Sequence, residues 1–272
     1  MAKGLFLGSL LALAAATLAA CTSSSPVDWD APVTRGGDAL PGRLVIGRTG
    51  EPRFDVDTTM LAAPVLAGAC EGSARVALSG SSGAERYVAW WAPRADSSAA
   101  LVAARSTDGG QSWGAPEPID TADHTPVGCK RPAPAIVADS ASGYVHVAYS
   151  MRDADGAGVF FSHSMDHGKM FHSPVTIVYG ERLAGVAIAA RGDTVAVAYV
   201  DPSADHPPVG LALSHTAGHI FEERLIVPGS IDVTDPAVTL APGRVAIAWV
   251  HRIPGGATSV VSRVGNLAGT PR

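Results

Sequence analysis

Two stretches of the chain repeat one unusual pattern of residues at fixed spacing. Ser106–Trp113 and Ser164–Phe171 both read S-x-D-x-G-x-x-aromatic, and Ser214–Phe221 keeps the serine, the glycine and the aromatic residue but lacks the aspartate. Asp and Ser side chains bond nearby backbone N–H groups, and glycine adopts the positive φ that a tight turn needs. The pattern therefore predicts three hairpin turns of the same type, each with an aromatic ring packed against the sheet.

This pattern resembles the Asp-box, or BNR repeat, of sialidase-like β-propellers. The resemblance implies that the turns are structural and that they lie on the face opposite the ligand site. The residues to which it gives this structural role are Ser106, Asp108, Gly110, Trp113, Ser164, Asp166, Gly168 and Phe171.

A second repeat, V/I-A-W/Y, lies upstream of the turns. It ends at Trp90, Tyr149, Tyr199 and Trp249, in steps of 59, 50 and 50 residues. Each copy lies in a run of alternating apolar residues, which is typical of a β-strand. Similar runs before it and on both sides of the turn give four strands per unit, the pattern of propeller blades. The sequence therefore predicts an all-β propeller of four or five four-stranded blades. The last unit lacks an outer strand of its own, which we expect Gly42–Gly47 to supply.

The N-terminal region differs in composition from the repeats. Residues 1–20 combine Lys3 with an apolar run, and the sequence LAAC ending at Cys21 resembles a bacterial lipobox. We expect residues 1–20 to be a lipoprotein signal peptide and residues 21–42 to be a lipidated cysteine with a flexible tether, followed by the propeller in residues 43–272. An ordinary signal peptide or an uncleaved anchor is the alternative. Thr22 after the cysteine implies a membrane-anchored protein of the cell envelope, sorted to the outer membrane.

The net charge bears on the class of binding partner, and the spacing of the cysteines bears on disulfide formation. The formal net charge is −5 without a basic stripe, so nucleic acid is not an expected partner. Cys70 and Cys129 each lie 20 residues before the aromatic residue of a V/I-A-W/Y repeat, so they occupy equivalent connectors of adjacent blades. In an exported protein we predict a disulfide between them, with two separate buried thiols as the alternative.

Arginines recur in phase with the same repeat. Arg94, Arg152 and Arg252 follow three of the four aromatic residues by three or four positions. Guanidinium groups bind carboxylates through paired hydrogen bonds, and the family resemblance implies an arginine triad for the carboxylate of sialic acid. The alternative is a repeated surface charge that faces solvent.

The resemblance also suggests catalytic candidates. Tyr179 and Glu181 are neighbours on a connector, as the family's activated tyrosine nucleophile requires, and Asp123 or Asp235 could act as the acid. The match rests on position rather than on a motif, and the chain has fewer blades than the family's enzymes.

A histidine- and methionine-rich stretch coincides with the second turn. His163, Met165 and His167 are weak candidates for a soft metal such as copper. Alternate residues of a hairpin face opposite sides, so they are not expected to converge, and the sequence predicts no cofactor.

The sequence is compatible with three functions, of which we expect the first. This is a non-catalytic envelope lipoprotein whose propeller binds a glycan or an envelope protein. The second is an exo-α-sialidase or a related glycoside hydrolase. The third is a copper-handling envelope protein.

Overall fold

The computed structural model describes residues 25–56, 64, 66–79, 84–123, 125–139, 142–152, 154–253 and 255–268. The regular structure of these residues is β-strand throughout. They include no helix of the length and apolar character needed to cross a membrane. The predicted signal peptide and the lipidation site Cys21 lie outside the described residues.

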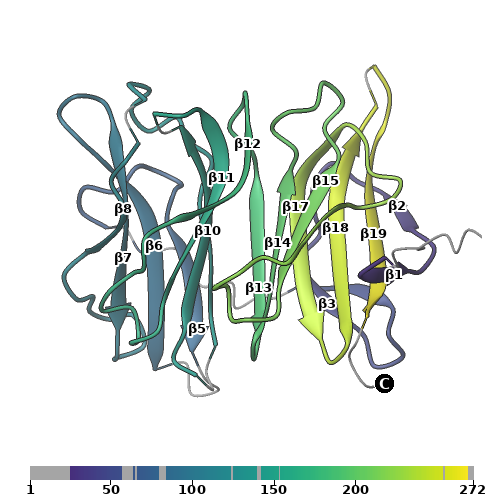
Figure 1. The fold of residues 1–272 in the computed structure, drawn as a ribbon, viewed down its shortest axis with the longest axis horizontal. Helices are drawn as coiled ribbons and strands as arrows, with labels where there is room; N and C mark the ends of the chain where they lie inside the picture. The colour runs from purple at the N-terminus through teal and green to yellow at the C-terminus, as the bar shows by residue number, and fades with distance from the viewer. Residues whose placement is uncertain are drawn as a thin grey trace, which may run out of the picture.

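Three sheets each contain four consecutive antiparallel strands, and these are blades I to III. Blade I consists of β5 (Arg75–Ser79), β6 (Glu85–Pro93), β7 (Ala99–Ser106) and β8 (Glu117–Asp120). Blade II consists of β9 (Ala135–Ala138), β10 (Val145–Arg152), β11 (Ala157–Ser164) and β12 (Val175–Gly180). Blade III consists of β13 (Val186–Arg191), β14 (Thr194–Val200), β15 (Val209–Ser214) and β16 (Glu223–Ile226). In Figure 1 the sheets follow one another across the molecule in chain order.

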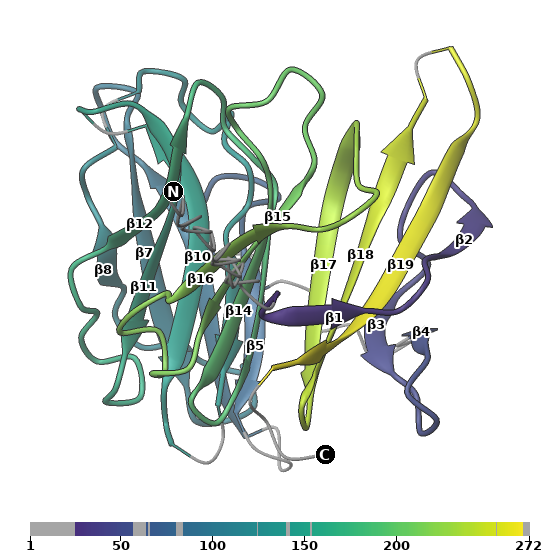
Figure 2. The same ribbon diagram turned by 45° about the vertical axis from the view of Figure 1, so that its right-hand side comes forward.

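Blade IV is completed by the N-terminal segment. Its own strands are β17 (Val233–Ala241), β18 (Arg244–Arg252) and β19 (Thr258–Leu267). Two short strands, β1 (Val27–Trp29) and β2 (Val33–Gly36), pair side by side with successive halves of β19 (Figure 2). The predicted flexible tether therefore contains ordered strand. The physical reason is that the long edge of β19 leaves backbone groups to be paired, while Val27 is 1% exposed in the core.

The segment expected to form that outer strand has a different place. Strands β3 (Arg43–Ile46) and β4 (Pro52–Asp55) pair with each other in a separate two-stranded sheet, and β3 contacts β17. Leu44 is buried against Ala246, Ala248 and Val264, on the face of blade IV rather than at its edge. The prediction for Gly42–Gly47 was therefore wrong. The described residues form four blades and a two-stranded hairpin beside the fourth.

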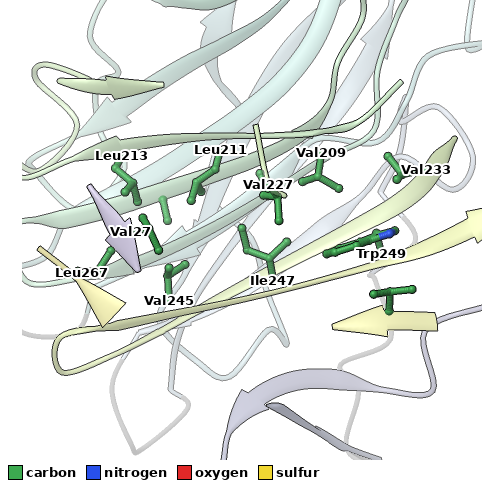
Figure 3. Packing of buried hydrophobic residues seen from close by; sticks show 13 residues of the cluster. Val27, Val209, Leu211, Leu213, Val227, Val233, Val245, Ile247, Trp249 and Leu267 are labelled. Carbon is green, nitrogen blue, oxygen red and sulfur yellow. The ribbon is translucent and has the colours of Figure 1, made fainter. Parts of the chain in front are cut away.

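Neighbouring blades pack face to face through their apolar side chains. Between blades III and IV, Leu211 and Leu213 of β15 share one buried cluster with Ile247 and Trp249 of β18 (Figure 3). Tyr149, Tyr199 and Trp249, which end three of the repeated V/I-A-W/Y strands, are buried in such clusters between blades. Trp90 is buried instead within blade I and the segment before it. In three blades the repeat therefore marks the inter-blade core, and the predicted all-β propeller is confirmed.

The repeated turns share one set of hydrogen bonds at the ends of their blades. In the first, the Ser106 hydroxyl donates to Asp108 at 2.7 Å and accepts from the backbone N–H of Gly110 at 2.8 Å. In the second, Ser164 makes the same two bonds with Asp166 and Gly168, at 2.7 and 2.9 Å. Hydrogen bonds from Ser112 and Ser106 lower the pKa of Asp108, so this carboxylate is held in its charged form.

The third turn keeps this geometry without an aspartate. Thr216 occupies the position of the missing aspartate, and its hydroxyl lies 3.2 Å from that of Ser214 and accepts from the N–H of Ile220 at 3.0 Å. Gly218 donates to Ser214 at 3.0 Å with a φ of 86°, and the buried Phe221 packs edge-on against Phe161. A threonine hydroxyl therefore replaces the carboxylate as acceptor.

The two ends of the strands differ in what they carry. Each repeated turn donates a hydrogen bond to the turn between the first two strands of its blade, through Gly109 to Ala84, His167 to Gly143 and Ala217 to Asp193. This end is called the turn face. The opposite end holds the connectors between blades and the loops between second and third strands, and it is called the connector face.

Candidate binding site at the propeller axis

The innermost strands of the four blades line an open pocket, called the axial pocket. Strands β5, β9, β13 and β17 contact one another in succession, and β9, β13 and β17 are half-buried along nearly their whole length. The pocket opens where these strands begin, on the connector face, and has a volume of about 530 Å³. This volume lies in the range of small-molecule sites.

The described lining of the axial pocket contains two charged residues. Arg75 begins β5, and its Nη1 donates to the carbonyls of Gly72 and Ala74, both at 2.8 Å. Partial burial lowers the pKa of Arg75, but arginine remains charged at any physiological pH. Asp235 lies in a bulge of β17 with a φ of 50° and accepts from the Thr234 hydroxyl at 2.9 Å. The pocket thus offers one cation, one anion and the backbone groups of four strand ends.

Two of the phased arginines bind the chain itself. Arg94 donates to the carbonyl of Thr121 at 2.9 Å, and Arg152 donates to that of Glu181, also at 2.9 Å. Thr121 and Glu181 each come directly after the outer strand of the same blade. Both arginines therefore fasten the loop after a second strand to the end of a fourth strand. Neither belongs to the described lining of the axial pocket.

The third phased arginine has another kind of partner. Arg252 donates from Nε to the Thr234 hydroxyl at 3.2 Å, and Thr234 in turn bonds Asp235. Arg252 is thus linked to Asp235 of the pocket through one intervening side chain, that of Thr234. The three phased arginines therefore hydrogen-bond three different parts of the chain, a role that neither predicted alternative included.

The predicted nucleophile lies at the rim of the propeller. Tyr179 is on β12, the outermost strand of blade II, with 44% of its surface exposed and its ring edge-on to Phe160 at 5.9 Å. Glu181 follows this strand with an exposed side chain, and its N–H donates to the carbonyl of Pro202 at 3.2 Å. Tyr179 and Glu181 are therefore separated from the axial pocket by the width of the sheet.

Asp123 is fully engaged in a buried ion pair. Its carboxylate oxygens accept from Nε and Nη2 of Arg131 at 2.7 and 3.0 Å, and one accepts from the N–H of Thr125. Both charged side chains are at most 1% exposed. The guanidinium lies over the ring of Trp91 at 5.8 Å. Because a general acid must reach its substrate, this geometry makes Asp123 a structural residue of the connector.

The disulfide reinforces that same connector. Cys70 and Cys129 are bonded, with a Cα–Cα distance of 5.2 Å, so the first of the two alternatives for these residues is confirmed. Trp91, beside Cys70, donates from its indole nitrogen to the carbonyl of Pro132 at 2.8 Å. Blades I and II are therefore joined by a covalent bond, a buried ion pair and an aromatic hydrogen bond.

The three metal candidates on the second turn point in different directions. His163 is buried between blades II and III, whereas Met165 is 43% exposed. His167 turns toward blade I, where its Nδ1 lies 3.4 Å from Glu85. His163, Met165 and His167 do not converge, as the alternation of a hairpin predicts.

The sequence reasoning named Asp235 but missed Arg75. Both lie where a connector meets the first strand of a blade, and a search restricted to the loop after the second strand passes over that position. A charged residue one or two positions before the first apolar run of a repeat is the signal that would have found it.

Comparisons with known proteins identify the architecture. No protein-family model and no curated protein matches the chain. Among solved structures the chain is similar to the Hadza microbial sialidase Hz136, with a TM-score of 0.50 and 17% identity over 70% of this chain and 43% of that one. It is also similar to the phage phi92 endosialidase, with a TM-score of 0.51 and 10% identity over 72% and 36%. The chain has a sialidase-like propeller fold. It spans less than half of either protein, and likeness at this identity concerns the fold alone.

Proposed function

We propose that this protein is a glycan-binding lipoprotein of the bacterial cell envelope that does not hydrolyse its ligand. The observation that carries the proposal is the axial pocket on the connector face, which holds Arg75 and Asp235. A charged pair among strand-end amides and carbonyls can bind the hydroxyl and carboxylate groups of a sugar. A concave site of this size suits the end of a glycan better than the flat surface of a protein partner.

The engagement of the catalytic candidates supports binding without turnover. Asp123 is buried against Arg131, and Tyr179 lies on an outer strand. Arg94 and Arg152 are bonded to backbone carbonyls of their own blades. A sialidase mechanism would need these groups around one sugar. Their separate structural contacts therefore support a propeller that has kept the fold without the catalytic arrangement.

The remaining parts of the proposal concern the turns and the anchor. The shared hydrogen bonds of the three repeated turns support their assignment as Asp-boxes. Lipidation of Cys21 would hold the propeller at the outer membrane, with the residues before β1 as a short spacer. Mass spectrometry of the purified protein tests this anchor, because a diacylglyceryl cysteine at position 21 has a defined added mass.

Sialidase activity is the second candidate. It is favoured by the two solved structures of similar fold, one a sialidase and the other an endosialidase. In that case Arg152 would be needed at the substrate, in spite of its bond to Glu181.

A binding experiment separates these functions. Full-length protein in detergent is applied to an array of sialylated and neutral oligosaccharides, beside Arg75→Ala, Asp235→Ala and the control Arg152→Ala. We expect the two pocket variants to lose about tenfold or more in affinity, because each removes a charged hydrogen bond. The control should bind as the wild type does. Equal binding by all four proteins, or a loss confined to Arg152→Ala, would refute the axial pocket as the site.

A further inference from the structure

A second pocket lies on the turn face, between blades II and III, and its polar lining is mainly imidazole. It has a volume of about 150 Å³ and includes His163, His172 and His219. His163 belongs to β11 and His172 follows the second repeated turn, whereas His219 belongs to the third repeated turn. Two blades therefore contribute side chains to one site.

The three rings are in direct contact. The ring of His163 stacks on that of His172, with centroids 4.7 Å apart. The ring of His219 lies edge-on to the ring of His163, with centroids 4.6 Å apart. The rings of His172 and His219 lie 6.3 Å apart. The backbone helps to fix this group, because the N–H of His172 donates to the carbonyl of His163 at 2.9 Å. Imidazoles so close together can be ligands of one ion after small side-chain rotations.

His163 brings an unsatisfied polar atom to the site. It is 5% exposed, and its Nε2 is buried without a hydrogen-bond partner among the described residues. A buried polar atom without a partner costs free energy, and such an atom in a native protein calls for a bound water or ion. An imidazole nitrogen is a common ligand of divalent transition metals, so a bound ion would satisfy this atom.

We propose that His163, His172 and His219 form a site for an imidazole-preferring divalent transition metal, Cu²⁺ or Zn²⁺. The described lining of the pocket contains no carboxylate or thiolate, and an all-imidazole set favours these ions over Mg²⁺ or Ca²⁺. The described residues contain no three ligands that already converge on one point. Because His172 and His219 are exposed, their rings can rotate toward the fixed ring of His163 as the ion binds.

The consequence of this site is a link between two blades. An ion held by β11 and by the third repeated turn would join blades II and III, as the disulfide joins blades I and II. Binding to the folded state alone raises stability by mass action. The site is independent of glycan binding at the opposite end of the strands.

The test uses the full-length protein in detergent, freed of metal with a chelator and dialysed. Titration calorimetry with Zn²⁺ measures affinity, and electron paramagnetic resonance of the Cu²⁺ form counts coordinating nitrogens. The variants His172→Asn and His219→Asn change exposed side chains, and His215→Asn is a matched exposed control on the third repeated turn. Melting temperatures without metal verify that all four proteins are folded.

We expect one ion per chain, nitrogen coordination by three imidazoles, and a higher melting temperature with Zn²⁺. Each ligand variant should bind about tenfold or more weakly, because even the loss of an outer-shell partner has an effect of that size. The control should match the wild type. No binding, or equal affinity in His172→Asn, His219→Asn and wild type, would overturn the proposal.

Discussion

The turn face repeats the same contacts from blade to blade, whereas the contacts on the connector face differ from one junction to the next. On the turn face, three blades repeat one set of hydrogen bonds, and Thr216 preserves it where the aspartate is missing. On the connector face, the junction of blades I and II has a disulfide and a buried ion pair, whereas Ala184 at the next junction donates to Ser150. Repetition therefore maintains the blade, and the individual connectors are free to shape a binding site.

The largest expected effect comes from breaking the connector face at its ion pair. Asp123→Ala leaves the Arg131 guanidinium buried without its carboxylate, and both side chains are at most 1% exposed. We expect a loss of about 3–5 kcal/mol in the free energy of unfolding, measured by urea denaturation. The double variant Asp123→Ala with Arg131→Met should recover part of this loss. A loss below about 1 kcal/mol in the single variant would mean that the pair does not stabilise the connector.

Acid should weaken the interface of blades II and III next. Burial and the nearby His163 lower the pKa of His146 to about 3, and the pKa of His163 is about 4. Above pH 6.5 both histidines are neutral in the folded and unfolded chain. Between pH 6.5 and about 4 these histidines bind protons in the unfolded chain but stay neutral in the folded chain. The free energy of unfolding therefore falls as the pH falls. At pH 5 we expect a loss of about 2 kcal/mol per histidine.

Melting temperatures in chelator at pH 7.5 and pH 5 measure this effect. The control is His146→Phe, since the His146 ring stacks between Tyr144 and Phe161 and both of its nitrogens lack partners among the described residues. An apolar ring of similar shape should reduce the acid sensitivity without loss of stability at pH 7.5. The same pH dependence in wild type and His146→Phe would contradict the assignment to His146.

A pair of glycine variants compares the two faces directly. Gly218 on the turn face has a φ of 86°, and a Cβ there would lie 2.4 Å from the Phe161 ring. Gly229 in a connector has a φ of 79° and no atom within 4 Å of such a Cβ. We expect Gly218→Ala to cost about 2–3 kcal/mol, and Gly229→Ala about 1 kcal/mol from backbone strain alone. Equal costs in thermal unfolding would show that the turn face tolerates change as readily as the connector.

The smallest effect concerns the third turn. Thr216→Asp restores the carboxylate of the other two turns, where it accepts several hydrogen bonds. Hydrogen bonds to a charged acceptor are stronger, so we expect a gain of about 0.5–1 kcal/mol. Asp166→Thr should lose a similar amount. Destabilisation by Thr216→Asp would mean that the third turn has adapted to its threonine.

The sequence was sufficient for those features of the fold that repeat. The apolar runs ending at Trp90, Tyr149, Tyr199 and Trp249 predicted the second strand of each blade, because a strand that is covered on both faces is apolar along its length. The equivalent positions of Cys70 and Cys129 predicted the disulfide. The outer strand of blade IV was not predictable in this way. Val27–Trp29 and Val33–Gly36 are too short for a periodic signal, and they are strands because β19 offers an edge.

The candidate site was less accessible from the sequence. The phase of the arginines predicted their common face, but it did not show that Arg94 and Arg152 bond to backbone carbonyls. Likewise, the grouping of His163 with His172 and His219 arises from contacts between two blades, which residue order does not reveal.

The most direct test of the central claim is hydrolysis of a fluorogenic sialoside by the full-length protein at high concentration, with Arg152→Ala alongside. The account predicts no release of fluorophore by either protein, because Arg94, Arg152 and Asp123 bond the chain itself and Tyr179 lies on an outer strand. Turnover by the wild type that is abolished in Arg152→Ala would contradict it and would establish a sialidase on a reduced propeller.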